Sequence, residues 1–291
     1  MRRVVLCFAL AAVPCFAETV RIGVFGLFHP VQLKLAAVKG GALEVRAGEA
    51  SFVLRDGETA TAVLKDGEIE CRWSGGEARS RTIAAAPRDG GLILGVPGKI
   101  QRQFRGRLEI GVSKGALQPV AFMDLEVAVA SVVAAESPPG ARIEALKAQA
   151  VVARSFYVAA HRRHAAFDFC DTTHCQFLRA PPRVSQAAAR ATLATRGLIL
   201  AWHGAPVAAL YSAHCGGRTR IPGRAEPGDY PYFAVPCSYC ARGPHRGVAS
   251  GHGIGLCQTG AAAMATGGAD FRAILDHYYP NTVLAPLPLP R

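Results

Sequence analysis

Residues 123–140 read MDLEVAVASVVAAESPPG and mark the point where the sequence changes from strand-like to helix-like patterns. The alanine- and valine-rich run over 123–135 predicts a helix that begins at Asp124. The sequence SPPG at 137–140 ends this helix, because a residue before proline is pushed out of the helical region and the second proline cannot continue the hydrogen-bond ladder. Glu136 is therefore expected at the end of a helix.

More helices are expected after this turn. From Ile143 to Tyr157 apolar residues step by 3, 4, 3 and 4 positions, the spacing of one helix face, and this predicts a helix over 142–161. Shorter helices are predicted over 186–195, 260–265 and 271–279. A hairpin around His203-Gly204 is predicted to join strands at 198–202 and 207–212.

Before residue 115 the pattern is one of short strands and tight turns. Val20, Ile22 and Val24 alternate with polar or small residues, and Asp-Gly pairs at 56, 66 and 89 supply turns. The sequence therefore predicts an α+β fold. Its expected parts are a strand-rich N-terminal region, 18–103, a mixed helix and sheet domain with Gly-rich loops, 104–282, and a Pro-rich tail, 283–291.

Composition places the chain among folded proteins and narrows its partners. Of the 291 residues, 50% are hydrophobic and 19% are charged, which suits a globule and not a disordered chain. The 33 basic and 21 acidic residues give a net charge of +12, yet no run of lysine and arginine is longer than two. Because a nucleic-acid binder concentrates its charge on a recognition element, an anionic polymer or envelope surface is the expected partner instead.

The N-terminus predicts export. Arg2 and Arg3 precede an uncharged run over 4–17, and Cys15-Phe16-Ala17 resembles a small-x-Ala cleavage site, so 1–17 is interpreted as a signal peptide. An uncleaved anchor is the alternative, but fourteen apolar residues are too few to span a bilayer as a permanent helix. We therefore expect an exported protein of the periplasm or cell envelope with no stable membrane span after processing.

Two histidines and two cysteines within twelve positions form a candidate metal site. His164, Cys170, His174 and Cys175 supply the two imidazoles and two thiolates of a closed tetrahedral zinc site. Such a site would be structural. The alternative is a disulfide between Cys170 and Cys175, which an oxidising compartment would favour.

The remaining cysteines of the mature chain are unevenly placed. Cys71 stands alone, whereas Cys237-x2-Cys240 has the spacing of half a metal site or of a disulfide donor. Either Cys215 or Cys257 could be its partner, and the sequence does not fix the connectivity.

The position of Glu136 suits a general acid. A carboxylate at a helix C-terminus meets the negative end of the helix dipole, and the apolar run before it limits its hydration. Both effects disfavour the charged form and are expected to raise the pKa of Glu136. The alternative is that Glu136 is simply exposed before a proline turn.

Six blocks resemble, in order and spacing, the stage II sporulation protein D / amidase enhancer family (SpoIID/LytB), over about residues 104–282. They are VVAAESP at 132–138, EALKAQAVVAR at 144–154, DTTHCQ at 171–176, ALYSAHCGGRT at 209–219, GHGIGLCQTGA at 251–261 and HYYPNT at 277–282. Two blocks depart from the family pattern. The serine-rich block of the family appears here as Ser212-Ala-His-Cys215, and the Met-Ser of the family appears as Leu256-Cys257. His214, in the first of these, is a further candidate residue whose role the sequence does not assign.

The resemblance implies a cell-wall enzyme, a lytic transglycosylase that cuts peptidoglycan glycan strands with one glutamate as acid and base, and in some members a bound zinc. It points to Glu136 as that glutamate and to Tyr211, His252 and Gln258 as polar groups that converge on a sugar ring. Arg154 could hold an acetamido oxygen, or could be a solvated arginine on a helix face. The rival function is a binding module that holds glycan and stimulates a cell-wall amidase without cutting.

Overall fold

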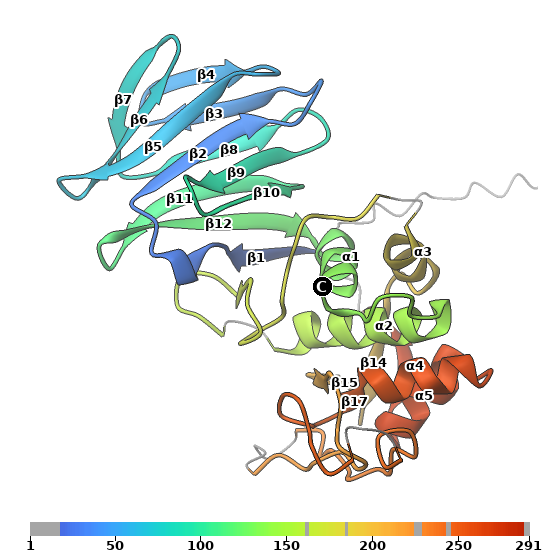
Figure 1. Cartoon of the computed structure of the whole chain (residues 1–291). Helices are drawn as coiled ribbons and strands as arrows, with labels where there is room; N and C mark the ends of the chain where they lie inside the picture. Colours follow the sequence, from blue (N-terminus) through green and yellow to red (C-terminus); the bar gives the residue numbers. More distant parts are fainter. Residues whose placement is uncertain (1–17, 161–162, 184–185, 224–228, 243–245, 288–291) are drawn as a thin grey trace, which may run out of the picture.

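The computed structural model describes residues 18–160, 163–183, 186–223, 229–242 and 246–287, so the predicted signal peptide lies outside the described residues. Antiparallel strands make up the N-terminal part, and helices mixed with short strands follow (Figure 1). This arrangement confirms the predicted α+β class. In the described part of the chain, no helix has the length and apolar character needed to cross a membrane.

Two sheets form the N-terminal part. The first has the order β13 (Phe169–Cys170), β1 (Thr19–Gly23), β12 (Ala116–Asp124), β11 (Arg107–Ser113), β8 (Ile83–Pro87), β3 (Leu43–Ala47) and β4 (Ala50–Leu54). The second has the order β10 (Ile100–Phe104), β9 (Leu92–Val96), β2 (Gln32–Ala37), β5 (Thr59–Lys65), β6 (Glu68–Trp73) and β7 (Gly76–Ser80). A 3-10 turn, Gly26–Phe28, follows β1.

Alternating apolar residues let the two sheets share one core. In β3, Leu43, Val45 and Ala47 are buried while the residues between them are exposed, as a half-buried strand requires. Buried residues of both sheets, such as Leu35 and Ile110, belong to one continuous hydrophobic cluster. The strands therefore pack face to face as a sandwich.

The change from strand to helix occurs where the sequence predicts it. β12 ends at Asp124, and α1 spans Leu125–Glu136. Asp124 Oδ1 accepts hydrogen bonds from the N–H groups of Glu126 at 2.9 Å and Val127 at 3.1 Å, which satisfies two of the free donors at the helix start. Because β12 lies inside the first sheet, the sandwich holds α1 directly at its N-terminus.

Helix α2 (Ile143–Ala159) lies at the centre of the molecule, with α1 and α3 on one side of it and α4 and α5 on the other (Figure 1). Apart from Lys147, every residue from Ala145 to Val158 is buried. One side of α2 contacts the sandwich core through residues such as Phe156, and the other side contributes Val151 to a second core. The other helices are α3 (Ala187–Ala194), α4 (Gln258–Thr266) and α5 (Phe271–Tyr278).

The predicted hairpin after residue 198 is wrong in its second strand. β14 (Leu198–Trp202) pairs with β15 (Ala205–Pro206) and with β18 (Val283–Pro286), which lies in the segment predicted as a tail. The chain turns away after β15, because the Ala209 N–H donates to the Val207 carbonyl at 2.8 Å. It then forms β16 (Tyr211–Ser212), which pairs in parallel with β17 (Leu256–Cys257).

Candidate functional site

The candidate site is a cavity of about 250 Å³ with Glu136 in its wall. Glu136 is the last residue of α1 and is half-buried. Its Oε1 accepts hydrogen bonds from the Phe177 N–H at 2.6 Å and from the Tyr211 hydroxyl at 2.9 Å. The cavity is also lined by Phe156, Thr173, Cys175, Ser212, Ser250, His252 and Gln258.

Burial raises the pKa of Glu136, and the hydrogen bonds from Phe177 and Tyr211 offset part of this rise. The direction agrees with the one predicted from the helix end and the apolar run. Both hydrogen bonds reach the same oxygen. Among the described residues, Oε2 has no such donor, so this oxygen is the one that can carry a proton to a molecule in the cavity.

Tyr211 links Glu136 to a second buried side chain. Its hydroxyl lies 2.9 Å from Glu136 Oε1 and 3.3 Å from the Oε1 of Gln176. Burial raises the pKa of Tyr211 well above its usual value, so the hydroxyl keeps its single proton. That proton can be donated to Glu136 when the carboxyl is charged and to Gln176 when it is not.

Gln258 and His252 also line the cavity. Gln258, at the start of α4, is buried and donates from Nε2 to the Glu136 carbonyl at 2.9 Å, which fixes the end of α1. His252 Nδ1 accepts from the Ile254 N–H at 3.0 Å. Partial burial lowers the pKa of His252, so the ring is neutral at pH 7 with its proton on Nε2.

Two site residues were not predicted from the sequence. Gln176 is buried and donates from Nε2 to the Ala153 carbonyl at 3.1 Å, which aims its Oε1 at Tyr211. Ser212 has a buried hydroxyl in the cavity wall with no hydrogen-bond partner among the described residues, so it can bond to a ligand there. Both lie in blocks that carry the family resemblance, DTTHCQ and ALYSAHCGGRT, and this was the available signal.

The structure does not bring Arg154 to this cavity, which argues against its predicted contact with substrate. Its side chain is fully buried, and its guanidinium forms two hydrogen bonds with Glu126 at 2.8 and 2.7 Å and a third with the Leu198 carbonyl at 2.9 Å. Lys147 is partly exposed, but from Ala148 to Val158 every residue of α2 is buried, so this part of the helix has no solvent-facing side. Arg154 therefore joins α1, α2 and β14 as a buried ion pair.

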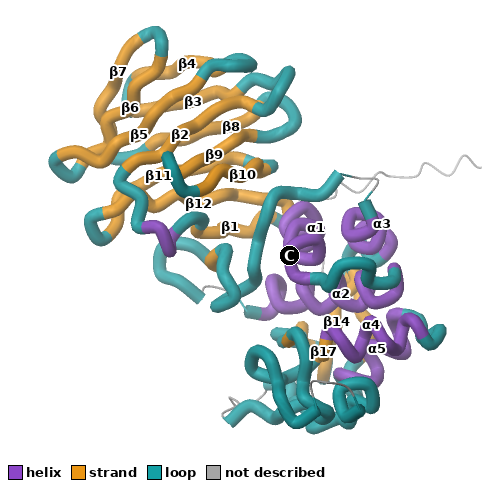
Figure 2. The backbone as a smooth tube through the Cα atoms, viewed as in Figure 1, coloured by secondary structure: helices purple, strands orange, loops and turns teal. Residues whose placement is uncertain are grey.

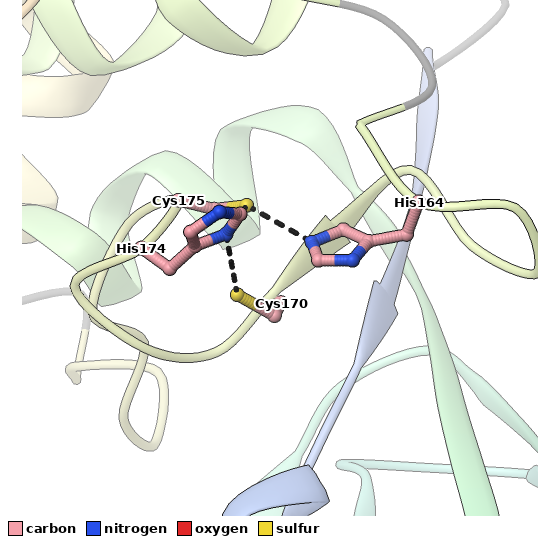
Figure 3. Close-up of side chains that lie close together, drawn as sticks. All are labelled: His164, Cys170, His174 and Cys175. Carbon is pink, nitrogen blue, oxygen red and sulfur yellow. Dashed lines mark hydrogen bonds between the residues drawn. The ribbon is translucent and has the colours of Figure 1, made fainter.

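The four predicted metal ligands lie together beside the cavity (Figure 3). Their ligand atoms are all within 4.8 Å of one another. His174 Nδ1 lies 3.7 Å from the Cys170 Sγ and 3.6 Å from the Cys175 Sγ, and His164 Nε2 lies 3.3 Å from the Cys175 Sγ. A zinc tetrahedron with ordinary Zn–S and Zn–N bonds has S···N edges of about 3.5 Å, so the residues present fit this ion.

Charge in this group already favours a metal. The hydrogen bond from the Cys175 thiol lowers the pKa of Cys170 to about 3, so the pair readily holds one negative charge. With two imidazoles and two thiolates, the group could hold a metal such as zinc.

The loop that carries these ligands is also the loop that contacts Glu136. It is fixed to the sandwich by Arg102, whose Nη1 donates to Asp171 Oδ2 and to the Leu178 carbonyl, both at 3.0 Å. The parallel pair Gly23 and Cys170 joins the loop to β1. Any contact that fixes residues 170–178 therefore also fixes the Phe177 N–H, which donates to the Glu136 carboxyl.

Larger hollows elsewhere lack this chemistry. One of about 770 Å³ beside Tyr239 and His277 has no carboxylate among its described lining residues. Another of about 420 Å³ contains Asp171, whose carboxylate is engaged by Arg102 at 3.0 Å. The Glu136 cavity is therefore the best candidate for catalysis, although it is smaller.

The other four cysteines of the 200–260 region form a second group. Cys215, Cys237, Cys240 and Cys257 are all buried, and their Sγ atoms lie within 4.8 Å of one another, so this group could also hold a metal. The sequence offered either Cys215 or Cys257 as the partner of the Cys237-x2-Cys240 pair, and in the structure both lie next to that pair.

A comparison with protein families agrees with the resemblance for the first three of the six blocks, at 132–138, 144–154 and 171–176. Residues 113–202 match the family model SpoIID, described as stage II sporulation protein, and over these residues the chain is similar to that family. The match includes Glu136 and the His/Cys group but ends before Tyr211, His252 and Gln258. A search of curated proteins found no match.

Proposed function

We propose that this SpoIID-like segment, with the loops that follow it, makes the protein a peptidoglycan lytic transglycosylase in which Glu136 is the single acid and base. The observation that carries the proposal is the half-buried Glu136 carboxyl in a cavity wall, with its pKa raised by burial and its Oε1 held by Phe177 and Tyr211. A carboxyl with a raised pKa keeps its proton to a higher pH than an ordinary glutamate does, which suits a general acid.

The reaction needs one proton donor that later becomes an acceptor. Glu136 donates its proton to the glycosidic oxygen as the bond from that oxygen to the anomeric carbon breaks. The C6 hydroxyl oxygen of the same sugar then bonds to the anomeric carbon and gives its proton to the Glu136 carboxylate. The product is an anhydro-ended sugar, no water is consumed, and Glu136 returns to its first state.

The composition of the cavity supports this use of one carboxylate. Hydrolysing glycosidases pair two carboxylates across the scissile bond. Among the described residues that line this cavity, Glu136 is the only acidic one. The Ser212 hydroxyl supplies a polar contact to the sugar, and His252 adds a neutral ring. Tyr211 lies beside them in the cavity wall, where its oxygen can accept a hydrogen bond from a sugar hydroxyl while its own proton stays with Glu136 or Gln176.

We propose that His164, Cys170, His174 and Cys175 hold a structural Zn²⁺. Four protein ligands leave no open coordination position, so the ion would supply order to a loop and not a reactive water. The residues of that loop act on Glu136 directly, through the Phe177 N–H and through Gln176 beside Tyr211. A third class of function, a zinc hydrolase, would need an open coordination position on the metal, and these four ligands leave none.

The cell-wall setting follows from the same family. Export through the predicted signal peptide, with the basic net charge of +12, suits a protein that meets the anionic cell wall. The partner of the proposed enzyme is the glycan strand, and a cell-wall amidase is the partner in the rival function as a glycan-binding activator.

The test is product analysis with the unmodified protein. The mature chain is incubated with intact and with peptide-stripped glycan, and the fragments are analysed by mass. The expected products are fragments with anhydro ends. The mass of each is lower by one water, about 18 Da, than the mass of the corresponding hydrolysed fragment. Reducing ends would contradict the transglycosylase, and tight binding without any cleavage would favour the amidase-activating module.

A further inference from the structure

The four cysteines outside the Glu136 cavity converge from three separate loops. Cys215 follows β16, Cys237 and Cys240 share one turn, and Cys257 ends β17. Each residue is less than 5% exposed, and the four Sγ atoms all lie within 4.8 Å of one another. Four thiols around one point are the donor set of a tetrahedral zinc or iron–sulfur centre.

The distances match a single small ion. The Sγ atoms of Cys240 and Cys257 are 3.5 Å apart. Zinc bonded to four thiolates at about 2.3 Å gives S···S edges of about 3.8 Å. Cys237-x2-Cys240 also has the short ligand spacing common in structural zinc sites.

The surroundings supply hydrogen bonds that thiolates accept. The Gly260 N–H donates to the Cys257 Sγ at 3.3 Å, and the Tyr278 hydroxyl donates to the Cys237 Sγ at 3.6 Å. Such outer donors stabilise and orient metal ligands. Helix α4 packs closely on the group at Gly260. A Cβ atom at this position would lie 2.6 Å from the Cys237 Sγ, so no larger residue fits there without a shift.

We infer that Cys215, Cys237, Cys240 and Cys257 bind one Zn²⁺ in a closed structural site, separate from the His/Cys group. This ion joins the segments that carry Ser212 and Gln258 in the cavity wall. Cys257 immediately precedes Gln258, and Cys257 is the register partner of Ser212 in the two-residue pairing of β16 with β17. So short a pairing supplies little order alone, and metal ligation supplies the rest.

Charge in the group is consistent with metal binding. Cysteine binds a metal as the thiolate and not as the thiol. Cys257 also caps α4, and the positive end of a helix favours a thiolate. A divalent ion would neutralise the charge that is otherwise buried.

The first experiment uses the unmodified chain, purified without added metal. Elemental analysis is expected to give two zinc ions per chain. Zinc X-ray absorption is expected to give about three sulfur ligands and one nitrogen ligand per zinc on average, because one site has four sulfur ligands and the other has two sulfur and two nitrogen ligands. One zinc with four sulfurs would support the new site and contradict the His/Cys site. One zinc with two sulfurs and two nitrogens would overturn the inference, as would two disulfides among the four cysteines, seen as a mass about 4 Da lower.

Variants then locate each ion. The double substitution Cys237→Ser and Cys240→Ser is expected to remove one zinc and leave a ligand average of two sulfurs and two nitrogens. Cys71→Ser, a lone buried cysteine in β6, is the matched control and should keep both ions. Unchanged zinc content in a folded Cys237→Ser/Cys240→Ser protein would refute the assignment. If that double variant fails to fold, the absorption spectrum of the unmodified chain decides.

Discussion

The two walls of the Glu136 cavity are built in different ways. One wall consists of α1, α2 and the 170–178 loop. The two helices pack on the core of the β-sandwich and are joined to each other by the Arg154–Glu126 ion pair, and the loop is fixed to the sandwich by strand pairing and by the Arg102–Asp171 ion pair. The other wall comes from residues 209–213 and 250–258, in a part of the chain that is mostly loop in Figure 2. Its regular structure beside the cavity is the two-residue pairing of β16 with β17.

This difference separates two tasks. The acid stands on rigid elements, where a small displacement would cost activity. The wall that meets the rest of the ligand stands on loops, which are held by side-chain hydrogen bonds and lie beside the four buried cysteines that could hold a metal. Damage to the first wall should therefore unfold the molecule, whereas damage to the second should remain local.

The largest expected effect on stability is in the first wall. Arg154→Met removes the fully buried partner of Glu126, whose side chain is 18% exposed, and removing one partner of a buried ion pair costs about 3–5 kcal/mol of unfolding free energy. Urea titration at pH 7 measures the loss. Arg88→Met breaks an exposed pair with Glu44 and is the control, with an expected change within about 0.5 kcal/mol. Equal effects of the two substitutions would show that Arg154 is not a structural anchor.

A ligand substitution in the His/Cys group should act on Glu136 from a distance. His174→Ala is expected to speed hydrogen exchange over 170–178 and to lower glycan cleavage about 10- to 100-fold, the usual range for groups that orient others around a metal site. Exchange in β14 should stay unchanged. If the 170–178 loop of His174→Ala exchanges as slowly as in the unmodified protein, the His/Cys group does not order the loop that contacts Glu136.

The sequence predicted the first wall better than the second, for physical reasons. The strand pattern, the Asp124 cap and the close spacing of the four metal ligands are local features, and local sequence encodes them. The second wall depends on contacts between distant segments. Cys215 and Cys257 become neighbours through the pairing of β16 with β17, and no spacing along the chain reveals that pairing.

Arg154 shows the limit of helix periodicity. The stepping of apolar residues predicted one buried face, but α2 lies between two cores, and from Ala148 to Val158 every residue is buried. Whether an arginine on such a helix meets solvent or a buried carboxylate depends on where Glu126 lies, 28 residues earlier. That information is tertiary.

A smaller effect is expected at the junction of the walls. Tyr211→Phe removes a hydrogen bond that lowers the pKa of Glu136, so the carboxyl should hold its proton to a higher pH. Because the reaction begins with protonated Glu136, the alkaline limit of the pH–activity profile should move upward. The cost in unfolding free energy is about 0.5–1.5 kcal/mol. A profile that moves to lower pH would contradict the hydrogen bond's role.

The raised pKa of Glu136 also predicts a pH-dependent stability. Between the pKa of an unfolded glutamate, about 4.3, and the raised folded value, the folded state binds more protons than the unfolded one, so stability falls as pH rises through this window. Glu136→Gln removes this loss. Its unfolding free energy should exceed that of the unmodified protein at pH 7, and the advantage should vanish below pH 4. An advantage independent of pH would contradict this account of the carboxyl.

Glycan cleavage by Glu136→Gln tests the central claim most directly. The amide keeps the shape of the side chain and its hydrogen bonds to Phe177 and Tyr211, but it cannot donate or accept the proton. Glu77→Gln, at an exposed position in β7, is the matched control. With peptide-stripped glycan, we expect Glu136→Gln to lose at least about 100- to 10,000-fold in rate while still binding glycan, and Glu77→Gln to lose nothing. Cleavage by Glu136→Gln at the unmodified rate would show that this carboxyl is not the catalytic acid.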